Sequence, residues 1–304
     1  MVNVCTVPLT QDPDDAYSAK AVERLERTYE KAKEWREITN EADAARVHPH
    51  SSLGADDRLF AVVPTSHLVW HGISHAVDHL DMYLNALVEH RMSFTIAPQS
   101  LARSGLLGAA HALWLLDAPS RRERQLRGLR IAHEEWRNER NAYAELIEIE
   151  HGTPGMEKLV AVRTEWMERA ITTGEQIGYT RQQVKEKPND TSLIVEVIER
   201  YEPHVGSEPG DMPLTATYRL LWRMYSGATH GYRWAVMPRV SFPDTDDVDP
   251  DSPDIGGHLT HGEDDHVLAV EGLALLIHRA FDLYSVRRLP HTFGLALPAL
   301  PGRY

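Results

Sequence analysis

An arginine and a histidine stand at a helical spacing that suits phosphate chemistry. His230 follows Arg223 by seven positions in the segment Arg-Met-Tyr-Ser-Gly-Ala-Thr-His. On an α-helix this spacing is about two turns, with an angular offset of about 20° and a rise of about 10 Å, so both side chains point the same way. A guanidinium can hold phosphate oxygens, and an imidazole can move a proton near neutral pH. The pair therefore predicts a site for phosphate chemistry.

The neighbouring residues place this pair on the polar side of an amphipathic helix. The apolar stripe lies on nearly the opposite side and consists of Leu214, Leu221, Met224, Tyr225, Ala228 and Tyr232. Arg219 and Ser226 flank Arg223 on the polar side. We assign Ser226 to the candidate catalytic group with Arg223 and His230. Arg219 and Arg233 are the candidate substrate-binding residues.

A second arrangement suits metal binding. Histidines recur every four residues along another predicted helix, at His67, His71, His75 and His79. Paired histidines on one helix face can hold zinc, and the arrangement resembles metal-binding bundles such as the DinB-like family. The ladder drifts by about 40° per step, so one ion would need ligands from a second helix, with candidates at His111, His133 and His278. The alternatives are a polar interface face or a divalent metal such as zinc held by His71, His75 and His79.

The helix that carries this ladder also has an apolar side. Its stripe lies about 190° from the histidines and consists of Val69, Ile73, Val77, Leu80, Leu84 and Leu87. The histidines therefore face solvent, another helix or a second copy of the chain rather than the core.

Two further polar clusters have simpler interpretations. The densest basic run consists of Arg121, Arg122, Arg124, Arg127 and Arg130, and a solvated face is favoured over a site for an anionic partner. A Gly-rich, acidic setting surrounds His258, His261, Glu263, Asp264, Asp265 and His266, and it is more typical of a solvated loop and helix cap than of a cation site. The tryptophans, among them Trp222 and Trp234, are interpreted as packing residues.

Helical signals dominate the rest of the chain. Prolines and capping residues at helix starts, together with Pro and Gly breaks, predict helices over about 12–47, 64–90, 99–117, 120–151, 156–177, 191–201, 213–237 and 264–288. No segment has the two-residue alternation of a convincing strand. The expected fold is an all-α helical bundle over residues 51–304, with a charged helical arm at 1–50 and an acidic, Pro-rich loop at 239–265.

Composition narrows the classes of function. The net charge of −13 over 304 residues argues against broad, sequence-blind binding to nucleic acid, although it allows a local basic groove. Cys5 is the only cysteine, which excludes a disulfide within the chain and, without a secretory leader, indicates the cytoplasm. No apolar run approaches the length that spans a bilayer. Phosphate-binding glycine loops, nucleophile elbows and dinucleotide fingerprints are also missing.

The Arg–His motif on a late helix of an all-α bundle resembles the HEPN superfamily of ribonucleases. The apolar segment Leu101-Ala-Arg-Ser-Gly-Leu-Leu-Gly-Ala-Ala-His-Ala-Leu-Trp-Leu-Leu-Asp117 is also similar to bacterial HEPN-like proteins. A polar residue often follows the arginine in that family, and this chain has Met224 there. A second match to the motif, Arg127 to His133, puts its two residues about 120° apart on a helix, so they should not converge.

The resemblance implies a metal-independent RNA endonuclease of a toxin or antiphage type. Arg223 would stabilise phosphate charge, and His230 would act as base or acid at the ribose 2′-hydroxyl, without a cofactor. The implied partners are RNA, a second copy of the chain that forms a shared cleft, and an antitoxin protein. No interaction with a membrane is expected. Two alternatives stay open: a metal-dependent bundle enzyme that uses the histidine ladder, and a non-catalytic HEPN-like interaction protein.

Overall fold

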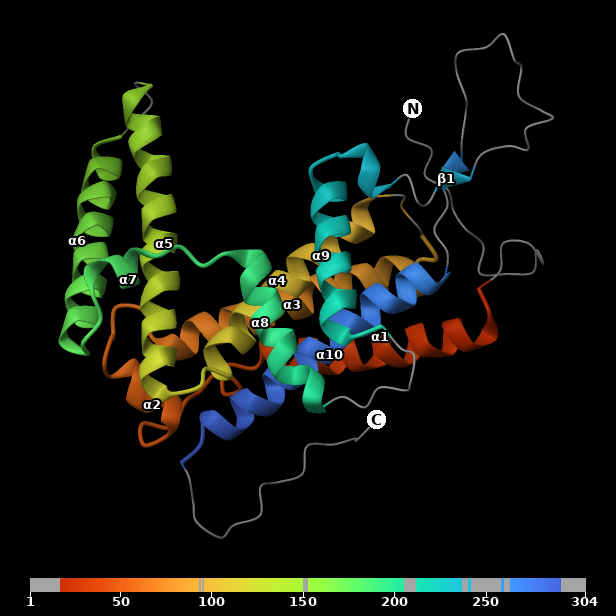
Figure 1. Ribbon diagram of the computed structural model, residues 1–304, viewed down its shortest axis with the longest axis horizontal. Helices are drawn as coiled ribbons and strands as arrows, with labels where there is room; N and C mark the ends of the chain where they lie inside the picture. The colour runs from red at the N-terminus through yellow and green to blue at the C-terminus, as the bar shows by residue number, and fades with distance from the viewer. Residues whose placement is uncertain are drawn as a thin grey trace. The chain divides into compact units, whose positions relative to one another are not determined.

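The computed structural model describes residues 17–92, 94, 96–149, 153–204, 212–236, 240–241, 258–259 and 263–290. The fold is all-α, and Figure 1 shows its helices in chain order. The α-helices are α1 (Ala19–Asn40), α2 (Ser52–Asp57), α3 (Thr65–Leu84), α4 (Ala97–Leu116), α5 (Arg121–Glu148), α6 (Pro154–Gln176), α7 (Arg181–Lys185), α8 (Asp190–Tyr201), α9 (Leu214–Thr229) and α10 (Glu263–Arg287). Shorter elements are the π-turn η1 (Asn85–Glu89), the 3₁₀ turns η2 (Glu202–His204) and η3 (Arg233–Ala235), and the two-residue antiparallel strands β1 (Val240–Ser241) and β2 (His258–Leu259).

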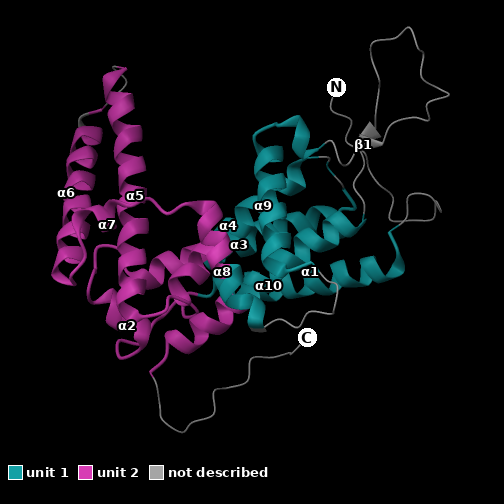
Figure 2. Cartoon of the chain, in the orientation of Figure 1, with its two compact units in different colours: residues 1–41, 73–109, 198–278 teal, residues 42–72, 110–197, 279–304 magenta. Residues whose placement is uncertain are grey.

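The chain forms two compact units that are interleaved in sequence (Figure 2). Unit 1 comprises residues 1–41, 73–109 and 198–278, and unit 2 comprises 42–72, 110–197 and 279–304. The helices α3, α4, α8 and α10 each begin in one unit and end in the other. The predicted division into an arm over 1–50 and a bundle over 51–304 stays a prediction.

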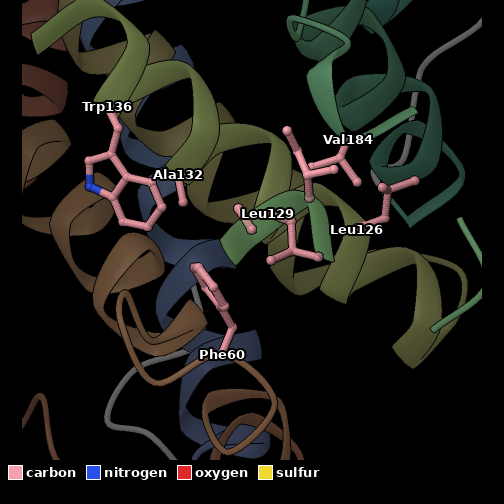
Figure 3. Packing of buried hydrophobic residues seen from close by; sticks show 8 residues of the cluster. Phe60, Leu126, Leu129, Ala132, Trp136 and Val184 are labelled. Carbon is pink, nitrogen blue, oxygen red and sulfur yellow. The ribbon is translucent and has the colours of Figure 1, made fainter. Parts of the chain in front are cut away.

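In unit 2, α5 packs along α6, and the short α7 lies against both (Figure 1). Their apolar faces enclose a cluster of Phe60, Leu126, Leu129, Ala132, Trp136, Ala170, Ile171 and Val184 (Figure 3). Gly174 makes the close approach of α7 possible, because a Cβ there would come within 2.3 Å of a Val184 methyl carbon. Thr180 caps α7 through a reciprocal capping box with Gln183, which lets a five-residue helix start in this place.

In unit 1, α1 packs through a buried face of Ala21, Leu25, Tyr29, Ala32 and Trp35. Arg24 on α1 forms an ion pair with Glu271 on α10, and Arg36 pairs with Asp81 on α3. The charged first helix is therefore tied into unit 1 by apolar and ionic contacts.

The sequence predicted most of these elements. All six residues of the predicted stripe on α3 and η1 are buried, at 3% exposure or less. The short α2 and α7 were missed. The acidic stretch 239–265 lies outside the described residues except for 240–241, 258–259 and 263–265, and the strand pair β1–β2 was not expected. No described helix has the length and apolar character needed to cross a membrane.

Candidate functional site

The helix α9 presents one apolar and one basic side, as its sequence predicts. Tyr218, Leu221, Trp222, Tyr225 and Ala228 are buried. The Tyr218 hydroxyl donates a hydrogen bond of 2.5 Å to the Gly272 carbonyl oxygen, and burial raises the pKa of Tyr218 well above its usual value. These contacts fix the rotation of α9 about its axis, so that Arg219 and Arg223 are exposed.

The end of α9 explains where His230 lies. The helix ends at Thr229, and His230 is its exposed C-cap. Gly231 follows with a φ of 72°, a left-handed conformation that favours glycine. The Tyr232 amide donates to the Gly227 carbonyl and the Gly231 amide donates to the Ala228 carbonyl, which is the hydrogen-bond pattern of a Schellman motif. The His-Gly sequence therefore ends the helix with His230 in solvent, at the C-cap of the helix that carries Arg223.

A third arginine joins this face from another helix. Arg103 on α4 donates from Nε to the Ser226 hydroxyl oxygen at 3.0 Å. Its guanidinium also lies 4.6 Å from the centre of the buried Trp222 ring. Both contacts hold the guanidinium in one orientation, which favours planar recognition of an oxyanion. Ser226 therefore positions Arg103 in this structure, and the sequence gave no local signal for this contact between residues 123 positions apart.

The charge of this face is not neutralised by the acidic side chains that the structure describes. Within the part of the chain that the structure describes, no carboxylate pairs with Arg103, Arg219, Arg223 or Arg233. We call Arg103, Arg219, Arg223, Ser226 and His230 the α9 strip. In a chain with a net charge of −13, the exposed Arg219 and Arg223 and the half-buried Arg103, which have no described carboxylate partner, form a local basic site of the kind that the composition still allowed.

Exposed aromatic rings lie beside the α9 strip. Tyr232 is 57% exposed and Trp234 is 54% exposed, whereas Trp222 is buried as expected. The Tyr232 and His230 ring centres are 6.0 Å apart. Two predictions were therefore wrong: Tyr232 does not continue the apolar stripe, because α9 ends before it, and Trp234 is not a fully packed side chain.

Gly227 holds the turn η3 against α9. A Cβ at Gly227 would come within 2.7 Å of both the Ala235 Cβ and a ring carbon of Trp234. The absence of a side chain at this position therefore lets η3 fold back onto the last turns of the helix. Ala235 is then buried, and Trp234 stays 54% exposed. Arg233 in η3 is exposed as well. One glycine thus brings a further arginine and an aromatic ring close to the end of α9.

The histidine ladder does not assemble a metal centre among the described residues. His67 and His71 are exposed, whereas His75 and His79 are half-buried with ring centres 4.2 Å apart. His79 Nδ1 donates to the backbone oxygen of His75 at 2.8 Å, since a carbonyl oxygen can only accept. Across the residues that the structure describes, no three His, Cys, Asp or Glu side chains are grouped so that they could hold a metal ion.

None of the three candidate second-helix histidines joins the ladder in a group that could hold a metal among the described residues. Burial lowers the pKa of His111 and of His133, the second of which lies beside Lys185 and Arg137. The His278 ring lies 6.4 Å from the Trp35 ring. His266 departs from its predicted loop setting, because it lies in α10 at 1% exposure, with Nδ1 2.8 Å from the Tyr83 hydroxyl oxygen. His261 lies outside the described residues.

The arginine run on α5 is solvated only in part, because Arg121 and Arg122 are exposed and the other members belong to a structural network. Arg124 and Arg127 are buried, and their side chains pair with the buried Asp56 and with Glu123 and Glu196. The run therefore stabilises unit 2 internally.

No protein-family model, curated protein or solved structure matches the chain in comparisons with each of these three groups. The HEPN resemblance stays a prediction that the motif residues carry.

Proposed function

We propose that the protein is a metal-independent RNA endonuclease that acts through the α9 strip. The observation that carries the proposal is the exposed pair Arg219 and Arg223 on α9, which have no carboxylate partner among the described residues, together with the exposed His230 at the C-cap of the same helix. The charge of an arginine that pairs with a carboxylate is neutralised within the protein. An arginine without a carboxylate partner is available to bind a phosphodiester.

The proposed chemistry is attack of a ribose 2′-oxygen on the adjacent phosphorus. His230 accepts the 2′-hydroxyl proton while the new P–O2′ bond forms and the P–O5′ bond breaks. The guanidiniums of Arg223 and Arg103 stabilise the negative charge that develops on the non-bridging oxygens. The 5′-oxygen leaves with a proton from the His230 of the second copy in the proposed dimer. The products are a 2′,3′-cyclic phosphate and a 5′-hydroxyl, and no metal ion is needed.

Unpaired RNA is the proposed form of the substrate. The aromatic faces of Tyr232 and Trp234 beside the arginines support this choice, since bases that are free of a duplex stack on exposed aromatic rings. Arg219 and Arg233 would follow the phosphates on either side of the scissile bond. A toxin or antiphage setting with an antitoxin partner belongs to the same proposal and rests on the resemblance alone.

The test is cleavage of a single-stranded RNA oligonucleotide by the purified full chain in excess EDTA. We expect cleavage that survives chelation and falls by about 10²-fold or more in Arg223→Ala and in His230→Ala. The matched controls are Arg122→Ala and His67→Ala, which remove exposed residues of the same types outside the α9 strip. Both controls should retain the wild-type rate, and a DNA oligonucleotide of the same sequence should stay intact because it lacks the 2′-hydroxyl.

Other outcomes would replace the proposal. Loss of cleavage on chelation would favour a metal-dependent enzyme. Full cleavage by both α9 variants would place the chemistry elsewhere. A folded wild-type protein that binds the RNA without cleaving it would favour the non-catalytic interaction protein, consistent with the departure at Met224.

A further inference from the structure

Unit 1 contains a cavity that the α9 strip does not use. Its volume is about 530 Å³, within the range of pockets that hold small molecules. Most of its walls are apolar, from Met82, Ala86, Leu87, Met92, Phe94 and Leu101. These residues come from the end of α3, from η1, from the chain that leads into α4 and from α4 itself. All the lining residues belong to unit 1, so the cavity is formed within one compact body.

A glycine allows the close helix packing beside the cavity. A Cβ at Gly105 on α4 would come within 2.5 Å of a Leu273 methyl carbon and within 3.4 Å of the His79 Cβ. Gly105 therefore lets α4 lie directly against α10 and α3. Ser104, its neighbour, then lines the cavity together with His79.

A small number of polar groups converge on this apolar space. The Tyr83 hydroxyl oxygen lies 2.8 Å from His266 Nδ1, and both residues line the cavity while being buried at 5% and 1% exposure. His79, Ser100 and Ser104 add further polar atoms to the lining. A buried hydroxyl–imidazole pair at the wall of an apolar cavity can orient a ligand through one hydrogen bond, which is how small-molecule sites obtain specificity.

The lining selects the charge of a ligand. No Asp, Glu, Lys or Arg is among the described residues that line the cavity. An ionised headgroup would therefore enter an apolar space without a permanent counter-charge, at a large cost in desolvation. The thioethers of Met82 and Met92 and the rings of Phe94 and Tyr83 instead favour an aromatic surface.

We propose that this cavity binds an uncharged, mainly aromatic small molecule that carries one hydroxyl or carbonyl group. The apolar walls hold the ring system, and the Tyr83–His266 pair receives the polar group. The α9 strip contributes no residue to the lining, so this binding is independent of the proposed RNA cleavage.

The test compares three ligands that share one ring system and differ in charge. We expect 2-naphthol to bind the full chain saturably at one site, followed by its fluorescence and by calorimetry. At neutral pH, 2-naphthoate and 2-naphthylmethylammonium should bind at least about tenfold more weakly. Tyr83→Phe, which keeps the ring and removes the hydroxyl, should weaken 2-naphthol binding by about threefold to tenfold.

Two variants that fill the cavity decide whether the site is the right one. Ala86→Trp places an indole inside the cavity, and Ala97→Trp places one at the exposed start of α4, where folding tolerates the larger side chain better. Both should abolish saturable binding. Ala142→Trp, an exposed helical alanine outside the cavity, should bind as wild type does. The proposal is overturned by the absence of saturable 2-naphthol binding, by binding that a folded cavity-filling variant retains, or by equal affinity for the charged ligands.

Discussion

Two groups of arginines in this chain have opposite surroundings. Four of the five in the α5 run of unit 2 pair with carboxylates: Arg124, for example, has 3% of its side chain exposed and lies 2.6 Å from an oxygen of the fully buried Asp56. Those of the α9 strip in unit 1 are held by a serine and an aromatic ring, or face solvent, with no carboxylate partner among the described residues. The denser basic run is therefore structural, and the sparser one is free to bind a phosphate. Local density of charge does not identify an anion site, whereas the partners of each charge do.

The largest expected difference between the two groups is in stability. Arg124→Ala leaves the Asp56 carboxylate buried with Arg121 and Gln125 as its remaining partners among the described residues, so we expect the free energy of unfolding to fall by about 3 kcal/mol. Arg223→Ala removes an exposed side chain and should change it by less than about 0.5 kcal/mol. Urea unfolding followed by circular dichroism measures both. Equal losses in the two variants would break the distinction.

The aromatic rings beside the α9 strip sharpen the comparison on the functional side. Trp234→Ala should weaken binding of a single-stranded RNA by about 1–3 kcal/mol, the effect of losing one stacked base. Leu220→Ala is the matched control, because Leu220 is 50% exposed on α9 but has no ring on which a base could stack. Fluorescence anisotropy with labelled RNA measures the affinities. Equal affinity of the two variants would remove Trp234 from the proposed site.

A smaller effect should come from His133, which belongs to the structural region on α5. Its side chain is 4% exposed, its Nε2 has no hydrogen-bond partner among the described residues, and burial, with Lys185 and Arg137 nearby, lowers its pKa. The unfolded chain then takes up a proton at a higher pH than the folded chain does. Stability should therefore fall as the pH drops below about 6.5.

Replacement of this histidine by a residue that does not titrate tests the cause. His133→Gln should reduce the loss of stability between neutral and mildly acidic pH, and the remainder should include His111, whose pKa burial also lowers. His67→Gln, at an exposed position, should leave the pH dependence as it is in wild type. Unfolding midpoints in urea at a series of pH values give the comparison. A wild-type pH dependence in His133→Gln would show that its burial does not matter.

The sequence was sufficient for features that depend on local periodicity. The apolar stripe of α3, the polar side of α9 and the long α5 and α6 follow from side chains that recur with the helical period. The short α2 and α7 escaped because five or six residues show too little of that period. Tyr232 was misplaced because α9 ends at Thr229 and the turn at Gly231 follows, so Tyr232 is no longer part of the helix.

Features that depend on tertiary contacts could not be predicted in this way. The α5 arginines look solvated until Asp56 and Glu196 are brought to them by folding. Arg103 joins the α9 strip only through Ser226 and Trp222, which lie far away in sequence. His266 resembles a loop histidine in sequence, and its buried contact with Tyr83 is visible only in the structure.

The salt dependence of RNA binding tests the central claim most directly, namely that the exposed arginines bind phosphates and the α5 arginines do not. The affinity of a single-stranded RNA would be measured over a series of salt concentrations for wild type, for Arg219→Ala/Arg223→Ala and for Arg121→Ala/Arg130→Ala, which removes two arginines that pair with carboxylates. The slope of log affinity against log salt should become shallower by about 0.7 for each α9 arginine removed. The α5 double variant should keep the wild-type slope. An unchanged slope in the α9 variant, or a shallower one only in the α5 variant, would contradict the account.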